Sequence, residues 1–410
     1  MKKSTLKQYA KLIARVGANV QKNQSVVISA SVNDEYFVKY VVEECYKAKA
    51  KHVRIDWYSD EITKLTYKNV KTEVLKNVPN YMVEKWKYDV ETLPARIYID
   101  SSDPDALASV DQNKMMEVRK ATGPIFKPLR DQMENKHQWT IAAIPSEAWA
   151  MKVFPNESKK NAVSKLWDAI LKCARADLGD PTENWKKHNA NLLEKCNKLN
   201  SLNIDTLEYS SKNGTNFKVR LLEGVNFLGG GSYTIGGTYY NPNMPTEECF
   251  TSPNRHSAEG VVYASKPLSL QGKVVEGFGF RFHEGKITEV IAKNDEDKEL
   301  FNGLINIDEG ASQLGEVALV PFNSPINETG LLFKNTLFDE NACCHLAIGM
   351  GFEDTIKGFE KMTKEEIKAF DLNDSLIHVD FMIGTSDLSI KATTRDGKTL
   401  DIFKDGTWAI

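Results

Sequence analysis

Four short runs in the second half of the chain carry side chains that can bind divalent metal ions. The first ends at Glu248, the second surrounds Glu316, the third covers residues 339–345, and the last holds His378 and Asp380. Carboxylates and imidazoles are ligands that Zn, Co or Mn accept in proteins. No run is diagnostic alone, but their combination predicts a metal centre.

His378 and Asp380 stand two positions apart in the otherwise apolar run 376–383. This run predicts a strand, and residues two apart in a strand point to the same face, so both side chains can reach one ion. The alternative is a buried His–Asp hydrogen bond without a metal, because buried polar groups commonly pair with each other.

Glu340 and His345 lie five positions apart and enclose the adjacent Cys343 and Cys344. One alternative to metal ligation is an ordinary loop carboxylate next to a core histidine. Another is a soft thiolate site or a nucleophilic cysteine. Free cysteines are usually small buried hydrophobes, and no Cys-His signature of a known cysteine protease surrounds this pair, which disfavours the thiol hypothesis.

The acidic pair Glu247-Glu248 follows Pro245, and Glu316 precedes an apolar run that extends to Val320. Adjacent carboxylates repel each other and resist burial unless a cation offsets their charge. An unpaired charge beside an apolar run is likewise costly. A solvated acidic pair remains the alternative for Glu247 and Glu248.

The first half of the chain alternates between strand-like and helical patterns. A helix is expected after Asn33-Asp34, which can cap it. Strands separated by helical segments indicate a parallel sheet with right-handed crossovers. The expected strands cover residues 25–30, 52–57, 95–99 and 138–144.

A dinucleotide site at this sheet is disfavoured by the loop chemistry. The loop 31–34 after the first strand contains neither GxGxxG nor GxxxxGK[ST], so the backbone cannot closely approach a pyrophosphate there. The glycine clusters 229–231 and 236–237 lie between strand-like segments. They predict bulges or close backbone approaches rather than a phosphate cradle.

The second half is strand-rich and largely antiparallel, with hairpin signals at residues 212–214, 284–286 and 395–398. We place the domain boundary near Pro181. The sequence therefore predicts an α/β N-terminal domain with a mainly parallel sheet at residues 1–181. An α+β, strand-rich C-terminal metal-binding domain is expected at residues 182–410.

The composition restricts the function classes. The chain has 410 residues, a formal charge of -3 and no polybasic patch, so neither nucleic acid nor a membrane surface is an expected partner. It has no signal-peptide-like start and no apolar run of ~20 residues. Its six cysteines show no CxxC spacing, which favours a reduced, cytoplasmic protein.

The runs NMPTEECFTSP, LGEVALVP, TLFDENACCHLAIG and HVDFMIG closely resemble the thermophilic aminopeptidase family, that of aminopeptidases T and S. The resemblance extends more loosely over nearly the whole chain. It implies a cytoplasmic, two-domain homodimer that releases N-terminal residues from peptides with a free N-terminus. It also implies two divalent ions, Co, Zn or Mn, with the ligands Glu248, Glu316, Glu340, His345, His378 and Asp380.

A dinuclear site accounts for an aminopeptidase reaction. Two ions ~3.5–4 Å apart can activate a shared water, polarise the scissile carbonyl and hold the free α-amine. Only one residue of the acidic pair needs to be a ligand. Glu247 is then available as the general base that takes the water's proton and passes it to the leaving amine.

One position departs from the family. Seven residues after His345 the family typically carries tyrosine, whereas this chain has Phe352. A phenol can bind a metal or donate a hydrogen bond to the developing oxyanion, and phenylalanine can do neither. Tyr239, Tyr240 or a water could take over this role.

Two other functions remain open at this stage. A mononuclear iron enzyme of the same fold that opens hydroxypyridine rings could use His345, His378 and Asp380 as a two-His-one-carboxylate set. The non-enzymatic alternative is a metal-binding relic. The presence of Glu248, Glu316 and Glu340 favours two metals and hydrolysis.

Overall fold

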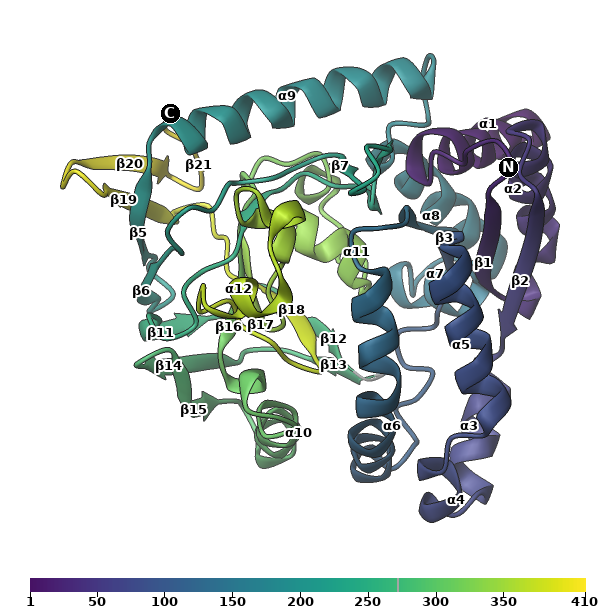
Figure 1. Ribbon diagram of the computed structural model, residues 1–410, viewed down its shortest axis with the longest axis horizontal. Helices are drawn as coiled ribbons and strands as arrows, with labels where there is room; N and C mark the ends of the chain where they lie inside the picture. The colour runs from purple at the N-terminus through teal and green to yellow at the C-terminus, as the bar shows by residue number, and fades with distance from the viewer. Residues whose placement is uncertain (271–272) are drawn as a thin grey trace. The chain divides into compact units, whose positions relative to one another are not determined.

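The computed structural model describes residues 1–270 and 273–410, which form two compact units (Figure 1). Each unit combines stretches that are distant in the sequence. The first consists mainly of Met1–Ala190 and Gly230–Thr246, and the second of Asn191–Gly229, Glu247–Leu270 and Val274–Ile410. None of the helices in this described part of the chain has both the length and the apolar character of a membrane span.

The first unit contains a five-stranded, all-parallel sheet with the strand order β2-β1-β3-β4-β9, which confirms the expected α/β class. The short fifth strand was not expected. The strands are β1 (Ser25–Ser31), β2 (His52–Tyr58), β3 (Ala95–Asp100), β4 (Trp139–Ala143) and β9 (Asn243–Met244). A separate short hairpin pairs β7 (Ser232–Tyr233) with β8 (Tyr239–Tyr240).

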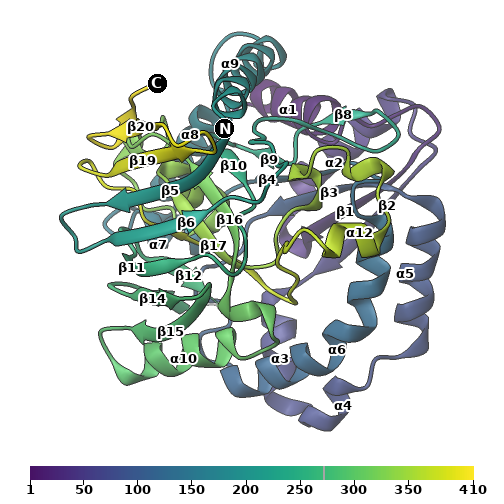
Figure 2. The same ribbon diagram turned by 60° about the vertical axis from the view of Figure 1, so that its left-hand side comes forward.

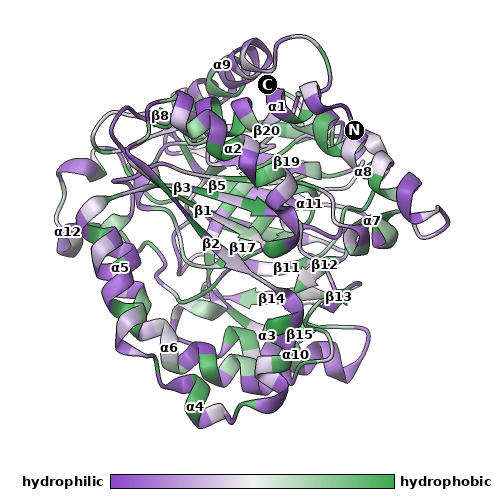
Figure 3. Ribbon diagram, turned by 90° about the vertical axis from the view of Figure 1, so that its right-hand side faces the viewer, coloured by the Kyte–Doolittle hydropathy of each residue, from purple (hydrophilic) through white to green (hydrophobic). Residues whose placement is uncertain are grey.

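Helices connect and flank these parallel strands. In Figure 3 the outer helices, such as α5 and α6, alternate between hydrophilic and hydrophobic residues, as expected for helices with one face on a core. The helices are α1 (Lys3–Leu12), α2 (Glu35–Lys47), α3 (Asp60–Asn69), α4 (Thr72–Lys76), α5 (Asn80–Thr92), α6 (Gln112–Met133), α7 (Glu147–Val153) and α8 (Lys159–Cys173). The next helix, α9 (Pro181–Ser201), begins in the first unit and ends in the second.

An aromatic cluster joins three of these helices. Tyr9 of α1, Phe37 of α2 and Trp167 of α8 have ring centroids 5.8–6.3 Å apart, and all three side chains are buried. Rings at such separations add attraction to the area that they bury. Their positions follow the helical spacing of apolar residues in the sequence.

The start of α2 differs from the local prediction. Asp34 does not cap the helix with its side chain. Its Oδ2 instead accepts a hydrogen bond from the Ser101 hydroxyl at 2.6 Å, and burial raises the pKa of Asp34 to about 6. A contact with a residue distant in the sequence therefore replaces the local capping bond.

The second unit is built on two larger antiparallel sheets. The eight-stranded sheet has the order β15-β14-β11-β6-β5-β19-β20-β21, and Figure 2 shows β19, β5, β6, β11, β14 and β15 side by side. Its strands are β5 (Ile204–Ser210), β6 (Asn216–Arg220), β11 (Glu259–Tyr263), β14 (Gly279–His283), β15 (Lys286–Ile291), β19 (Ser389–Thr394), β20 (Thr399–Lys404) and β21 (Thr407–Trp408).

The four-stranded sheet has the order β10-β16-β17-β18. Its strands are β10 (Cys249–Thr251), β16 (Leu314–Leu319), β17 (His345–Gly349) and β18 (His378–Met382). The remaining elements are the paired β12 (Leu268–Leu270) and β13 (Lys273–Val275), with the helices α10 (Asp295–Ile305), α11 (Thr336–Asp339) and α12 (Lys364–Lys368).

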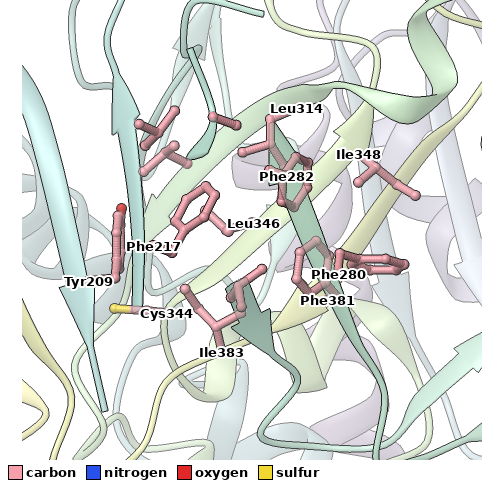
Figure 4. Packing of buried hydrophobic residues seen from close by; sticks show 14 of the residues in the cluster. Tyr209, Phe217, Phe280, Phe282, Leu314, Cys344, Leu346, Ile348, Phe381 and Ile383 are labelled. Atoms are coloured by element: carbon pink, nitrogen blue, oxygen red, sulfur yellow. The ribbon is translucent and has the colours of Figure 1, made fainter. Parts of the chain in front are cut away.

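The core of the second unit lies between these two sheets (Figure 4). Phe280 of β14 meets Phe381 of β18 at 5.1 Å between ring centroids, and Phe217 of β6 belongs to the same cluster. Leu346 and Ile348 of β17 point into it as well. One face of the four-stranded sheet is therefore covered by apolar packing, and its other face is available for a polar site.

Candidate metal centre

The strand register brings polar side chains together on the second face of the four-stranded sheet. Glu316 of β16 lies opposite Ala347 of β17, and Ala347 lies opposite Asp380 of β18. Directly opposed residues share a face, as do residues two apart on one strand. His345 and His378 precede Ala347 and Asp380 by two positions, so all four polar residues project from one face. The small Ala347 lies at their centre.

Glu248 reaches the same face from the edge strand. Cys249 pairs with Leu319, and both belong to the apolar cluster on the opposite face. The preceding residue, Glu248, therefore points toward Glu316. Gly229 packs against this segment, since a Cβ there would lie 2.4 Å from the Glu248 carbonyl oxygen. The glycine run thus marks a close backbone approach, as the sequence predicted.

Two sets of ligand atoms meet at this face, and both include Glu316. Among the described residues, one set is Glu248, Glu316 and His345, and the other is Glu316, His378 and Asp380. His345 Nε2 lies 3.3 Å from Glu248 Oε2. His378 Nε2 lies 3.1 Å from Glu316 Oε2 and 3.2 Å from Asp380 Oδ1. Ligands bonded at ~2.0–2.1 Å to a tetrahedral ion are about 3.3 Å apart, so these separations fit a metal.

Backbone carbonyls orient both imidazoles. The Nδ1–H of His345 donates to the Glu340 carbonyl at 2.8 Å, and that of His378 donates to the Met350 carbonyl at 2.7 Å. In a neutral ring this leaves the lone pair of Nε2 directed at carboxylates, which accept but do not donate hydrogen bonds. Only a proton or a metal ion makes that contact favourable, and metal-binding histidines typically donate their other ring N–H to an oxygen in this way.

The pKa shifts describe a site that lacks positive charge. Burial raises the pKa of Glu316 to about 7, and the carboxylates of Glu248 and Asp380 add to the effect. Burial alone would lower the pKa of His345, but the neighbouring Glu248 and Glu316 carboxylates outweigh it and raise it to about 10. Asp380 is the exception, because the charge of His378 outweighs its burial and lowers its pKa. A divalent cation would offset the excess of negative charge that raises the pKa of Glu316 and His345.

Glu340 and Glu247 are near the centre but belong to neither ligand set. Glu340 is 8% exposed. Burial raises its pKa well above the usual value, and the charges of Asp380 and Glu248 add to this shift. Glu247 is also buried, and its backbone N–H donates to Asn341 Oδ1 at 2.7 Å. The sequence pattern around Asn341 predicts no role for it, because spacing alone does not reveal what a side chain contacts.

The neighbouring cysteines and Phe352 pack against other side chains. Burial raises the pKa of both Cys343 and Cys344, so both stay thiols, which does not support a thiolate site. The ring of Phe352 lies 4.9 Å from the His378 ring and 5.3 Å from the Phe250 ring. The position that departs from the family therefore contacts a candidate metal ligand directly.

Comparisons with known proteins agree with this geometry. Residues 2–408 match Peptidase M29, described as thermophilic metalloprotease (M29). Aminopeptidase AmpS of Bacillus subtilis (strain 168) is 39% identical, over 98% of this chain and 98% of its own length. Aminopeptidase T of Thermus thermophilus is 37% identical, over 100% of this chain and 99% of its own. The structure of wild-type AmpT from Thermus thermophilus matches with a TM-score of 0.89 and 35% identity, covering 100% of both chains.

Proposed function

Because this chain belongs to the thermophilic metalloprotease family M29 and is a metallo-aminopeptidase, we propose that it removes N-terminal residues from peptides with water activated by two divalent ions. The ions are Co, Zn or Mn. Glu248, Glu316, Glu340, His345, His378 and Asp380 are their proposed ligands. The ring-opening iron chemistry considered from the sequence is not favoured by the family or by the aminopeptidase relatives.

The observation that carries the two-ion proposal is the shared position of Glu316. One residue in two sets of ligand atoms is what a bridging carboxylate requires. A lone catalytic zinc usually takes three protein ligands, whereas five of the proposed ligands already converge here and Glu340 lies beside them. The number of donors therefore supports two ions.

The residues of the chain then have separate tasks. When bound, divalent ions polarise the scissile carbonyl and lower the pKa of water. His345 and His378 stay oriented through their Nδ1–H bonds to the backbone. Glu247, outside both ligand sets, is the proposed general base that accepts a proton from water and delivers it to the leaving amine. The buried surroundings strengthen each of these electrostatic interactions.

Two further features belong to this proposal. The enzyme is a homodimer in which the second copy narrows access to the site, and it works in the cytoplasm. The family resemblance supports both features, and six cysteines without a disulfide among them support a reducing compartment.

Metal removal tests the proposed function. The purified protein is stripped with a chelator, shown to be metal-free by elemental analysis, and then titrated with Co, Zn or Mn. We expect hydrolysis of leucine p-nitroanilide to be lost and then restored as the metal content rises to two ions per chain. An N-acetylated substrate should stay uncleaved, because its α-amine is blocked.

The possible metal contents distinguish the alternatives. A verified metal-free protein that still cleaves peptides would falsify metal dependence. Full activity at one ion per chain would contradict the dinuclear mechanism, and a single iron would point back to ring-opening chemistry. Two bound ions without peptidase activity would indicate the non-catalytic relic.

A further inference from the structure

Asn341 connects two of the acidic runs that surround the candidate metal centre. It lies in the short turn Glu340–Ala342 that follows α11, and its side chain is fully buried. Its Oδ1 accepts a hydrogen bond from the backbone N–H of Glu247 at 2.7 Å. Its Nδ2 donates to the Leu337 carbonyl at 3.0 Å and to Glu340 Oε1 at 3.2 Å.

These bonds act on both acidic segments at once. The bond from the Glu247 N–H fixes the backbone immediately before the ligand Glu248. The bond to Glu340 Oε1 restricts rotation of that carboxylate and leaves Oε2 available for an ion. The third bond, to the Leu337 carbonyl, anchors the amide itself on α11.

An amide suits this position better than a carboxylate. The buried carboxylate of Glu340 already lies within hydrogen-bond distance of this side chain, so another negative charge beside it would be repelled. An aspartate could still accept from the Glu247 N–H, but when ionised it could not donate to Glu340. The two functions of the side chain, accepting on one side and donating on the other, are thus separable by one isosteric substitution.

We propose that Asn341 is a positioning residue that holds Glu340 and the Glu247–Glu248 segment in the arrangement that binds metal. The proposal rests on the proposed metal-dependent function. Asn341 acts through the ligands and does not contact the reacting atoms. Partners of this kind typically contribute 10–100-fold to metal affinity.

The test compares metal affinity in Asn341→Asp, Asn341→Ser and wild-type protein. Competition with a chelator of known affinity gives Kd, elemental analysis gives occupancy, and circular dichroism checks folding. We expect both variants to bind Zn ~10–100-fold more weakly. At saturating metal their kcat should recover toward the wild-type value, because the reacting groups are intact.

Asn294→Asp is a matched control. Asn294 also accepts a backbone N–H, from Asp297 at 2.8 Å, and donates to the Asp297 carboxylate at 2.8 Å. Asn294 caps α10, and none of the candidate ligands is among these partners. The same chemical change there should leave the Kd for Zn unchanged.

Several outcomes would overturn the positioning role. The positioning role is wrong if the folded Asn341 variants bind Zn with the wild-type Kd, even if wild-type protein binds two ions and is active. The positioning role is also wrong if both variants unfold with and without metal, because this result is expected of a residue that only stabilises the fold. If one variant unfolds, the other decides the comparison. A wild-type protein that binds no metal would instead contradict the proposed function.

Discussion

At the scale of single residues, we predict separable roles for the adjacent Glu247 and Glu248. Glu248→Gln removes a charge from a ligand set and should lower metal occupancy together with activity. Glu247→Gln should leave both ions bound and KM nearly unchanged, while kcat falls ~10²–10⁴-fold, as expected for the loss of a positioned proton carrier. Metal stoichiometry and steady-state kinetics on the two variants measure this difference.

The glutamine side chain has nearly the same shape as glutamate, so packing should be preserved in both variants. The assignment is reversed if Glu247→Gln loses a metal while Glu248→Gln keeps both. The backbone bond from Glu247 to Asn341 is unaffected by either substitution, because it uses the main-chain N–H. A loss of metal in Glu247→Gln therefore could not be attributed to that bond.

Phe352 offers a gain-of-function test at the same scale. Its ring contacts His378, and the family typically has tyrosine at this position. We expect Phe352→Tyr to raise kcat by ~10-fold or more, because a phenol can donate to the developing oxyanion, and one such donor is often worth ~10²–10³-fold. Metal content should remain unchanged.

Phe250→Tyr is the control for this experiment. The Phe250 ring packs against Phe352, so this substitution adds the same hydroxyl to the neighbouring ring. Its kcat should stay near the wild-type value. Equal kcat in Phe352→Tyr and wild-type protein would show that the reaction does not use a phenol at this position. The catalytic donor would then have to come from elsewhere in the site.

At the scale of elements, local pattern predicted several of the strands, and one pair of site residues followed from it. His378 and Asp380 do lie on one strand, β18, with side chains that meet, because the two-residue period of a strand is a local property. The central strands β1, β3 and β4 were similarly readable from their short apolar runs.

The convergence of the site on Glu316 could not be predicted from the residues alone. It depends on the register that sets Glu316 opposite Ala347 and Ala347 opposite Asp380. Register joins strands that are distant in the sequence and is specified by packing across the whole sheet. The same limit applies to Asp34, whose bond to Ser101 replaces the local helix cap. Only the resemblance of the four runs to a family supplied the missing long-range information.

At the scale of the whole molecule, the two compact units differ in their chemistry. Every residue of both ligand sets belongs to the second unit. The parallel sheet of the first unit lacks the glycine-rich loop of a nucleotide site. Helix α3 of the first unit has no buried residue. Its apolar residues Ile62 and Leu65 are three positions apart and therefore lie on one face of the helix. Their exposed fractions are 62% and 54%.

This uncovered apolar face leads to a prediction about assembly, namely that α3 contributes to the contact between two copies of the chain. Light scattering at micromolar concentration should show a dimer for the wild-type protein. The double substitution Ile62→Glu and Leu65→Glu should weaken the dimer by ~100-fold or more, because it places unpaired charges in an apolar contact.

The control substitution is Leu178→Glu, since Leu178 is 75% exposed and lies outside α3. It introduces the same kind of charge, and the dimer should persist. A wild-type monomer would refute both the dimer and the contact face, whereas a dimer that survives the double substitution would refute the face alone. Because the ligand sets lie entirely in the second unit, metal stoichiometry should remain the same in the dissociated variant. Any change in its kcat/KM would then report how far the second copy controls access of peptides to the site.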